Sequence, residues 1–177
     1  SKMISVVPNV HEPEPTPNAF DEREGLLFVG DFRHPPNLDG IIWFLQNCWP
    51  RIVEQIPDIS LYIVGDPVPD ALKEAVASAM RFGGQIHIMG HVPTLRPLLN
   101  SVRLSIAPLR FGAGMKGKVA EALAAGLPVV ATPIGTEGMG LTDCVNVREA
   151  ETAQAFAQAV VELYSDAAAW QTLRKKG

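Results

Sequence analysis

The chain has 177 residues, of which 47% are hydrophobic, with 15 glycines, 15 prolines and a formal net charge of −4 at pH 7. That length suffices for one domain with a sizeable core, and the negative charge disfavours a general nucleic-acid binder, which needs a basic surface. No apolar run approaches the roughly 18–20 residues that cross a bilayer, and no signal peptide is recognisable. The composition therefore predicts a cytoplasmic protein with no nucleic-acid partner and no transmembrane segment.

Along the chain, residues 1–24 are rich in proline and charge and show no periodicity, which predicts a linker or lead-in to a domain over residues 25–177. Short β-rich runs then alternate with helical patterns. Strands are predicted at 26–30, 60–65, 85–90, 102–109, 127–132 and 143–149. Helices are predicted over 38–56 with a kink at Pro50, over 68–81, over 94–100, from the glycine-rich loop to Ala125, and from 151 almost to the end.

The predicted strands are continuous apolar runs, each followed by a helix. This pattern is typical of a parallel sheet covered on both faces, so we predict an α/β, doubly wound, Rossmann-like domain. Ligands of such sheets bind outside the carboxyl ends of the strands. The candidate residues therefore follow the strands, at 30–33, 65–66, 90–92, 108–118 and 132–138.

The glycine-rich loop "GAGMKGK" (112–118) matches G-x-x-x-x-G-K of the Walker phosphate-binding loop. Val119 stands where that loop needs a hydroxyl to hold Mg²⁺, and the motif follows the fourth strand rather than opening the domain, so we reject a triphosphatase. The loop nevertheless precedes a predicted helix, whose free amides and dipole suit a phosphate. Lys116 and Lys118 add positive charge beside Gly112.

Glu121 lies in the second turn of this predicted helix, on the same side as Gly117 and Lys118 and opposite the apolar stripe. A carboxylate there could accept two hydrogen bonds from a ribose diol, next to a diphosphate at the helix start. The alternative is an exposed Lys118–Glu121 ion pair with no ligand. Glu137, after the fifth strand, could likewise face a donor sugar or simply be solvated.

The cysteines and histidines do not indicate a metal site. Cys48 and Cys144 are far apart in apolar sequence surroundings, which predicts two buried, reduced thiols. His87 and His91 lie on a predicted strand, where residues four apart are separated by roughly 13 Å, too far to share a zinc ion.

The block "IAPLRFGAGMKGKVAEALAAGLPVVATPIGTEGM" resembles the donor-binding signature of retaining glycosyltransferases of the "group 1" class, which have the GT-B fold. "LLFVGDFRHPPNLDGIIWF" and "DISLYIVGD" are similar to the first strands of the C-terminal domain of that family, and "VVPNV" to the segment that enters it. The resemblance covers about residues 5–175.

The resemblance implies a role for each matching position. Glu121 corresponds to the second glutamate of the E-x7-E motif, which binds the donor ribose, and His91 and Val92 to the loop that frames the base. Gly114 and Met115 match backbone positions at the diphosphate and donor sugar. The expected diphosphate and donor-sugar residues are Gly30, Asp31, Arg33, Gly112, Gly114, Met115, Lys116 and Lys118, with Glu137 as a further donor-sugar candidate.

Two positions depart from the family pattern. Ala113 stands where the first glutamate of E-x7-E is expected, so no catalytic residue is assigned. Asp31 stands where an arginine is common. Arg33, or Lys116 and Lys118, could supply the missing positive charge.

The function implied is transfer of a sugar from a nucleotide-diphosphate sugar to an acceptor hydroxyl, with retention and without a metal or other cofactor. The acceptor-binding N-terminal domain of the family has no counterpart in this chain, so the isolated domain is expected to be inactive; through that missing domain the protein could lie at a membrane. The alternatives are a non-catalytic scaffold module with the same fold and a relative that epimerises nucleotide sugars.

Overall fold

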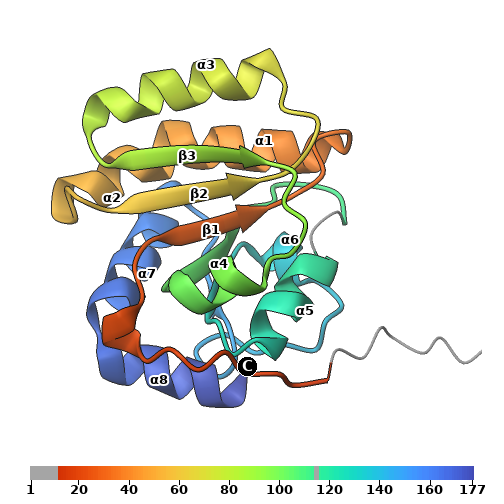
Figure 1. Cartoon of the computed structure of the whole chain (residues 1–177), viewed down its shortest axis with the longest axis vertical. Helices are drawn as coiled ribbons and strands as arrows, with labels where there is room; N and C mark the ends of the chain where they lie inside the picture. The colour runs from red at the N-terminus through yellow and green to blue at the C-terminus, as the bar shows by residue number, and fades with distance from the viewer. Residues whose placement is uncertain (1–11, 114–115) are drawn as a thin grey trace, which may run out of the picture.

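The computed structural model describes residues 12–113 and 116–177. Its centre is one parallel six-stranded sheet, with strand order β3-β2-β1-β4-β5-β6. The strands are β1 (Leu26–Val29), β2 (Ser60–Val64), β3 (Gln85–Gly90), β4 (Leu104–Ala107), β5 (Val129–Ala131) and β6 (Arg148–Glu149). The order reverses between β1 and β4, as the prediction of a doubly wound sheet requires. Figure 1 shows β1, β2 and β3 side by side and pointing the same way.

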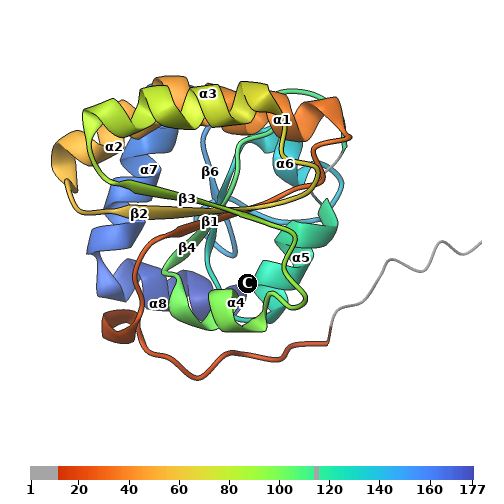
Figure 2. The ribbon, with the colours of Figure 1, turned by 45° about the horizontal axis from the view of Figure 1, so that its top comes forward.

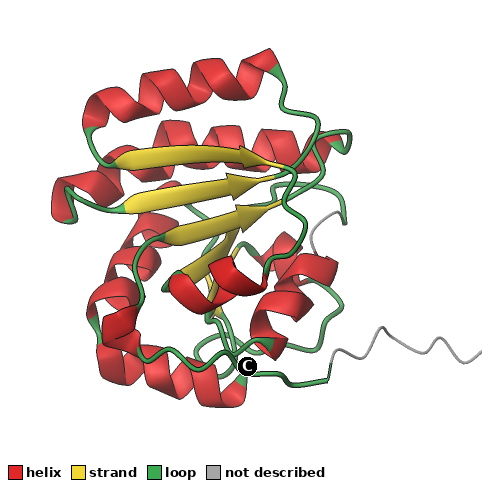
Figure 3. Ribbon diagram, in the orientation of Figure 1, coloured by secondary structure: helices red, strands yellow, loops and turns green. Residues whose placement is uncertain are grey.

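The helices cover both faces of the sheet (Figures 2 and 3). One face carries α1 (Pro35–Trp43), the π-helical turn η2 (Phe44–Cys48), α2 (Trp49–Gln55), α3 (Asp70–Ala79) and α7 (Ala153–Ser165). The other carries α4 (Arg96–Ser101) and α5 (Lys116–Ala124). The remaining elements are η1 (Phe20–Glu22), η3 (Met80–Phe82), α6 (Pro133–Thr136) and α8 (Ala167–Lys176).

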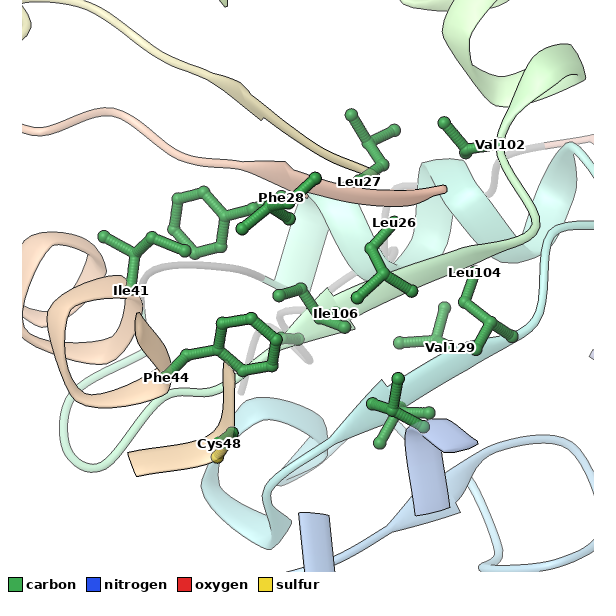
Figure 4. Packing of buried hydrophobic residues seen from close by; sticks show 14 of the residues in the cluster. Leu26, Leu27, Phe28, Ile41, Phe44, Cys48, Val102, Leu104, Ile106 and Val129 are labelled. Carbon is green, nitrogen blue, oxygen red and sulfur yellow. The ribbon is translucent and has the colours of Figure 1, made fainter. Parts of the chain in front are cut away.

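Apolar side chains from the sheet and from the α1–η2–α7 layer form the core. In Figure 4, Ile41 and Phe44 on the helical segment lie next to Phe28 and Ile106 of the strands, and all four are fully buried. Phe44 also meets Phe156 of α7 edge-on, with ring centroids 5.8 Å apart. The continuous apolar runs that predicted buried strands therefore correspond to strands packed on both faces.

The helix predicted over 38–56 is confirmed, and its irregularity lies at η2, directly before Pro50. A proline has no amide hydrogen to donate within a helix, so the ladder is interrupted at that point. The tryptophans on this helix serve the core: Trp49 is fully buried and donates its indole N–H to the Gly83 carbonyl at 3.2 Å.

Residues 12–19 have no helix or strand and lead into the short helix η1, but the segment 12–24 is held closely against the domain. Glu14 N and Thr16 N donate to the carbonyls of Ala124 and Ala125 at 2.8 and 2.9 Å, which satisfies the free end of α5. Arg23 is fully buried and donates to backbone carbonyls that include Leu99 O at 2.8 Å. This part of the predicted lead-in is thus packed as an element of the domain.

Within the described part of the chain, no helix combines the length and the apolar character that crossing a membrane would require.

Candidate functional site

The loops at the carboxyl ends of β1, β2 and β3 surround a cavity of about 260 Å³, which α5 closes from the other side. We call it the strand-end cavity. It brings together six residues that the sequence nominated for donor binding: Gly30, Asp31, Arg33, His91, Val92 and Lys118. Gly65 and Asp66, candidates from their strand-end position, line it as well. The rule that ligands bind at strand ends therefore predicted most of this lining.

The floor of the strand-end cavity depends on two glycines in close contact. Gly30 N donates to Val64 O at 2.9 Å, which continues the pairing of β1 with β2. A Cβ atom on Gly65 would lie 1.9 Å from the Gly30 carbonyl oxygen. Only a residue without a side chain allows the two strand ends to approach this closely.

Asp31 and Arg33 form an ion pair with several hydrogen bonds on the rim of the cavity. Arg33 donates to the Asp31 carboxylate from its backbone N at 2.9 Å, from Nε at 3.0 Å and from Nη2 at 2.7 Å. These hydrogen bonds lower the pKa of the Asp31 carboxyl to about 2. Arg33 was one of two candidate sources for the missing positive charge, but here its charge is largely offset by Asp31.

Replacing Arg33 with methionine is expected to raise the pKa of Asp31 from about 2 toward its ordinary 3.8. An NMR titration of the carboxyl carbon of Asp31 would measure this change. Because the folded pKa lies below the unfolded one, the pair stabilises the fold above about pH 3.8, and this stabilisation is lost as the pH falls toward 2. Lys73→Met, which breaks the exposed Asp70–Lys73 pair, should leave the pKa of Asp31 unchanged. An unchanged Asp31 pKa in the Arg33 variant would show that Arg33 is not what lowers it.

Helix α5 carries the predicted ribose carboxylate at the border of a second cavity. Glu121 lines a space of about 290 Å³ with Arg96 of α4 and with Glu14 of the lead-in. We call it the α4–α5 cavity. Leu95 lines both cavities, so they adjoin. Leu95, Arg96 and Glu14 were not predicted from the sequence, because the loop before α4 carries no motif and the lead-in has the composition of a linker.

Glu121 forms the ion pair with Lys118 that the sequence predicted as an alternative. Lys118 Nζ lies 3.1 Å from Glu121 Oε2, and the Glu121 side chain is 34% exposed. The pair spans the border between the two cavities, because Lys118 lines one and Glu121 the other. The pair therefore places a cation on the strand-end side and a carboxylate on the α4–α5 side.

The glycine-rich loop is anchored to α1. Gly112 has a φ of +77°, and a Cβ atom there would lie 2.6 Å from Pro36 Cγ. Arg110, two residues earlier, forms a bidentate ion pair with Asp39: Nε donates to Oδ2 at 2.8 Å and Nη2 to Oδ1 at 2.6 Å. This pair lowers the pKa of Asp39. Gly114 and Met115 lie outside the described residues. The first end of the loop is thus held against α1, and its last residues begin α5.

Gly112, Lys116 and Glu137 are not among the residues that line the strand-end cavity. Lys116 opens α5, and its Nζ is 3.7 Å from where a Cβ of Gly138 would lie. This places the Lys116 ammonium beside the loop that carries Glu137, which is exposed. These residues gather at the ends of β4 and β5, next to the cavity rather than in it.

The two cysteines differ, and the prediction of two buried thiols is wrong for one of them. Cys48 is fully buried, which raises the pKa of its thiol to about 12. Cys144 is exposed, in a turn with a φ of +60°. Its apolar sequence neighbours pointed to a strand, but only Arg148–Glu149 pair as β6, so Cys144 falls in the preceding loop.

His87 and His91 have separate surroundings. His87 stacks on Tyr62, with ring centroids 4.9 Å apart, whereas His91 lines the strand-end cavity. In the described ranges, no group of three or more His, Cys, Asp or Glu side chains is placed to hold a metal ion.

The doubly wound sheet, with adjoining cavities at its strand ends and beside the helix after β4, has the architecture of α/β domains that take ligands at their strand ends. The family described as "Glycosyl transferases group 1" matches residues 23–166. The chain belongs to that family.

Two curated relatives are similar to parts of this chain. The chain is 32% identical over 139 residues to an uncharacterised 44.6 kDa protein of the cps region of Klebsiella pneumoniae, covering 73% of this chain and 35% of that protein. It is 30% identical over 112 residues to a phosphatidyl-myo-inositol mannosyltransferase of Mycobacterium tuberculosis, covering 62% of this chain and 28% of that enzyme. The chain thus spans about a third of these relatives' length.

Solved structures share the fold. The C-terminal domain of LpcC, a glycosyl transferase group 1 protein of Francisella tularensis, superposes with a TM-score of 0.72 at 17% identity, covering 93% of this chain and 91% of that one. TarM gives a TM-score of 0.74 at 16% identity, covering 93% of this chain and 33% of that one. The chain therefore has the architecture of a C-terminal GT-B domain.

Proposed function

We propose that this chain is the donor-binding domain of a glycosyltransferase and holds the nucleoside diphosphate of a nucleotide sugar across its two cavities. The observation that carries the proposal is the Lys118–Glu121 pair on α5. It presents a cation to the strand-end cavity and a carboxylate to the α4–α5 cavity. A nucleoside diphosphate needs this combination: positive charge for the diphosphate, and an acceptor for the ribose hydroxyls.

In this proposal the diphosphate lies between the β1–α1 loop and the start of α5, where backbone amides and Lys116 and Lys118 favour an anion. Glu121 accepts hydrogen bonds from the ribose, and the backbone at His91 and Val92 borders the base. A solved TarM structure contains UDP, which supports a nucleoside diphosphate as the class of ligand. Gly114, Met115 and Glu137 are proposed at the donor sugar.

The reaction proposed for the whole protein breaks the bond between the anomeric carbon and the diphosphate and forms a bond to an acceptor oxygen, whose proton is released. Retention at the anomeric carbon is expected from the family resemblance. Helix amides and lysines stabilise the leaving diphosphate, and no metal or other cofactor is invoked. The acceptor site is assigned to an N-terminal domain, so this chain alone should bind donor without transferring it; cytoplasmic location, with membrane contact through that domain, is also proposed.

Calorimetric titration of this chain with UDP, GDP, ADP and dTDP tests the proposal. One of the four should bind, and Glu121→Gln should weaken it by about 1.5–3 kcal/mol, roughly tenfold or more, because the ribose loses a charged acceptor. Glu162→Gln is the matched control: Glu162 also pairs with a cation, Arg148 at 3.3 Å, but borders neither cavity. Equal affinity in native and Glu121→Gln protein would contradict the role of Glu121.

A second candidate function is a non-catalytic scaffold module. It is favoured by the two ion pairs at the cavities, since Asp31 offsets Arg33 and Glu121 offsets Lys118. Folded protein that binds none of the four nucleotides would favour the scaffold over the donor-binding domain.

A further inference from the structure

Asn37, in the first turn of α1, is a buried side chain with an incomplete set of hydrogen bonds. It is 2% exposed. Its Nδ2 donates to the backbone carbonyl of Asp31 at 2.8 Å, whereas its Oδ1 is buried with no hydrogen-bond partner. A buried acceptor without a partner is destabilising, and a leucine of similar volume would avoid that penalty. The cost of the unpaired Oδ1 indicates that asparagine stands here because of the hydrogen bond that its Nδ2 donates to the Asp31 carbonyl.

That amino group holds the turn from which Arg33 projects. The Asp31 carbonyl accepts from Asn37 Nδ2 and also from His34 N at 3.2 Å. On the other side of the same residue, the Asp31 carboxylate accepts four hydrogen bonds from Arg33. A Cβ on Gly30 would lie 3.1 Å from Asn37 Cβ, so the asparagine also packs directly on the end of β1. The buried amide thus hydrogen-bonds to Asp31 directly, packs on Gly30 and is linked to Arg33 through Asp31, and all three of these residues line the strand-end cavity.

We infer that Asn37 is a positioning residue of the donor site: its amide fixes the Asp31 carbonyl, and so sets where the β1–α1 loop and Arg33 stand relative to the strand-end cavity. It does not line the cavity and acts only through Gly30, Asp31 and Arg33. This inference rests on the proposed function for its effect on ligand, but the effect on the loop is independent of any ligand.

The test compares Asn37→Leu, Asn37→Ser and Asn47→Leu. Leucine keeps the volume and removes both polar atoms; serine cannot overfill the site and is too short to reach the Asp31 carbonyl. Asn47 is the matched control, since it lies on the same helical segment and its Nδ2 also donates to a backbone carbonyl, Trp43 O at 3.0 Å, but it borders neither cavity. Amide hydrogen exchange of Arg33 and His34 is measured by NMR, and affinity for UDP and GDP by calorimetry.

Both Asn37 variants should exchange the Arg33 and His34 amides about tenfold faster while the core strands remain protected. They should also weaken nucleotide binding about fivefold, as expected for loss of one positioning hydrogen bond. The melting temperature of Asn37→Leu should stay within about 3 °C of the native value. Asn47→Leu should change neither exchange at the loop nor affinity.

Unchanged exchange in both Asn37 variants would overturn the inference, as would faster exchange with unchanged affinity for a nucleotide that the native protein binds. Equal effects of Asn47→Leu would also overturn it, by showing a general loosening of the helix. If native protein binds neither UDP nor GDP, the donor-binding proposal loses its support for these two nucleotides, while the exchange arm still decides whether Asn37 sets the loop.

Discussion

Replacing Arg23 with methionine is expected to lower the free energy of unfolding by about 3–5 kcal/mol. The Arg23 side chain is fully buried and donates to Asn18 O, Leu99 O, Val102 O and Thr16 Oγ1, at 2.6 to 3.2 Å. Methionine fills much of the same space but donates to none of them, so buried acceptors from the lead-in and from the end of α4 lose a partner.

The size of the effect follows from where these acceptors lie. Leu99 and Val102 are separated from Arg23 by 76 and 79 positions in the sequence, so the guanidinium joins the lead-in to the end of α4. It also lies over the Trp170 ring, 5.3 Å from the centroid, and so connects the lead-in to α8. Burial, and then Arg174, lower the pKa of Arg23 to about 10, so the group stays charged at neutral pH.

Urea unfolding at pH 7, followed by tryptophan fluorescence, measures this loss. The control is Arg51→Met, since Arg51 is exposed and donates one bond, to Asn47 O at 2.7 Å; it should change the free energy of unfolding by less than about 0.5 kcal/mol. An Arg23 variant as stable as the Arg51 variant would show that residues 12–24 contribute little to the fold and serve only as a linker.

The lead-in shows why some of the fold could not be predicted from the sequence. Strands and helices left apolar runs and periodic apolar patterns, and the first five strands were predicted within about two residues of their observed ends, whereas the sixth begins five residues later than predicted. The lead-in is held instead by backbone hydrogen bonds and by one arginine that reaches distant carbonyls. Such contacts leave no period in the sequence, and a proline-rich charged segment has the same composition whether it is packed or free.

The candidate site likewise has a part that the sequence predicted and a part that it could not. The strand-end rule identified the residues around the cavity because it depends only on where strands stop. The pairing of Arg33 with Asp31 could not be predicted, because it depends on a loop conformation that Asn37 helps to fix. The exposure of Cys144 was missed because a strand of only two residues replaced the longer predicted one.

Replacing Gly65 with alanine is expected to cost about 3 kcal/mol or more of stability and to distort the strand-end cavity. An added Cβ would lie 1.9 Å from Gly30 O and 2.6 Å from Phe32 Cε2. The first contact is with backbone, which no side-chain rotation can relieve. The ends of β1 and β2 must therefore separate, next to the β1–α1 loop that borders the proposed diphosphate.

Gly90→Ala separates this steric effect from the general cost of losing a glycine. Gly90 ends the neighbouring strand with a φ of +64°, and a Cβ there would meet nothing within 4 Å, so alanine should cost only about 1–2 kcal/mol of backbone strain. Urea unfolding compares the two variants, and calorimetry with the nucleotide that binds native protein reports on the cavity. Gly65→Ala should be the less stable variant and should lose most of its affinity. If it is no less stable than Gly90→Ala, the two strand ends can move apart freely, and the cavity is not shaped by the contact between them.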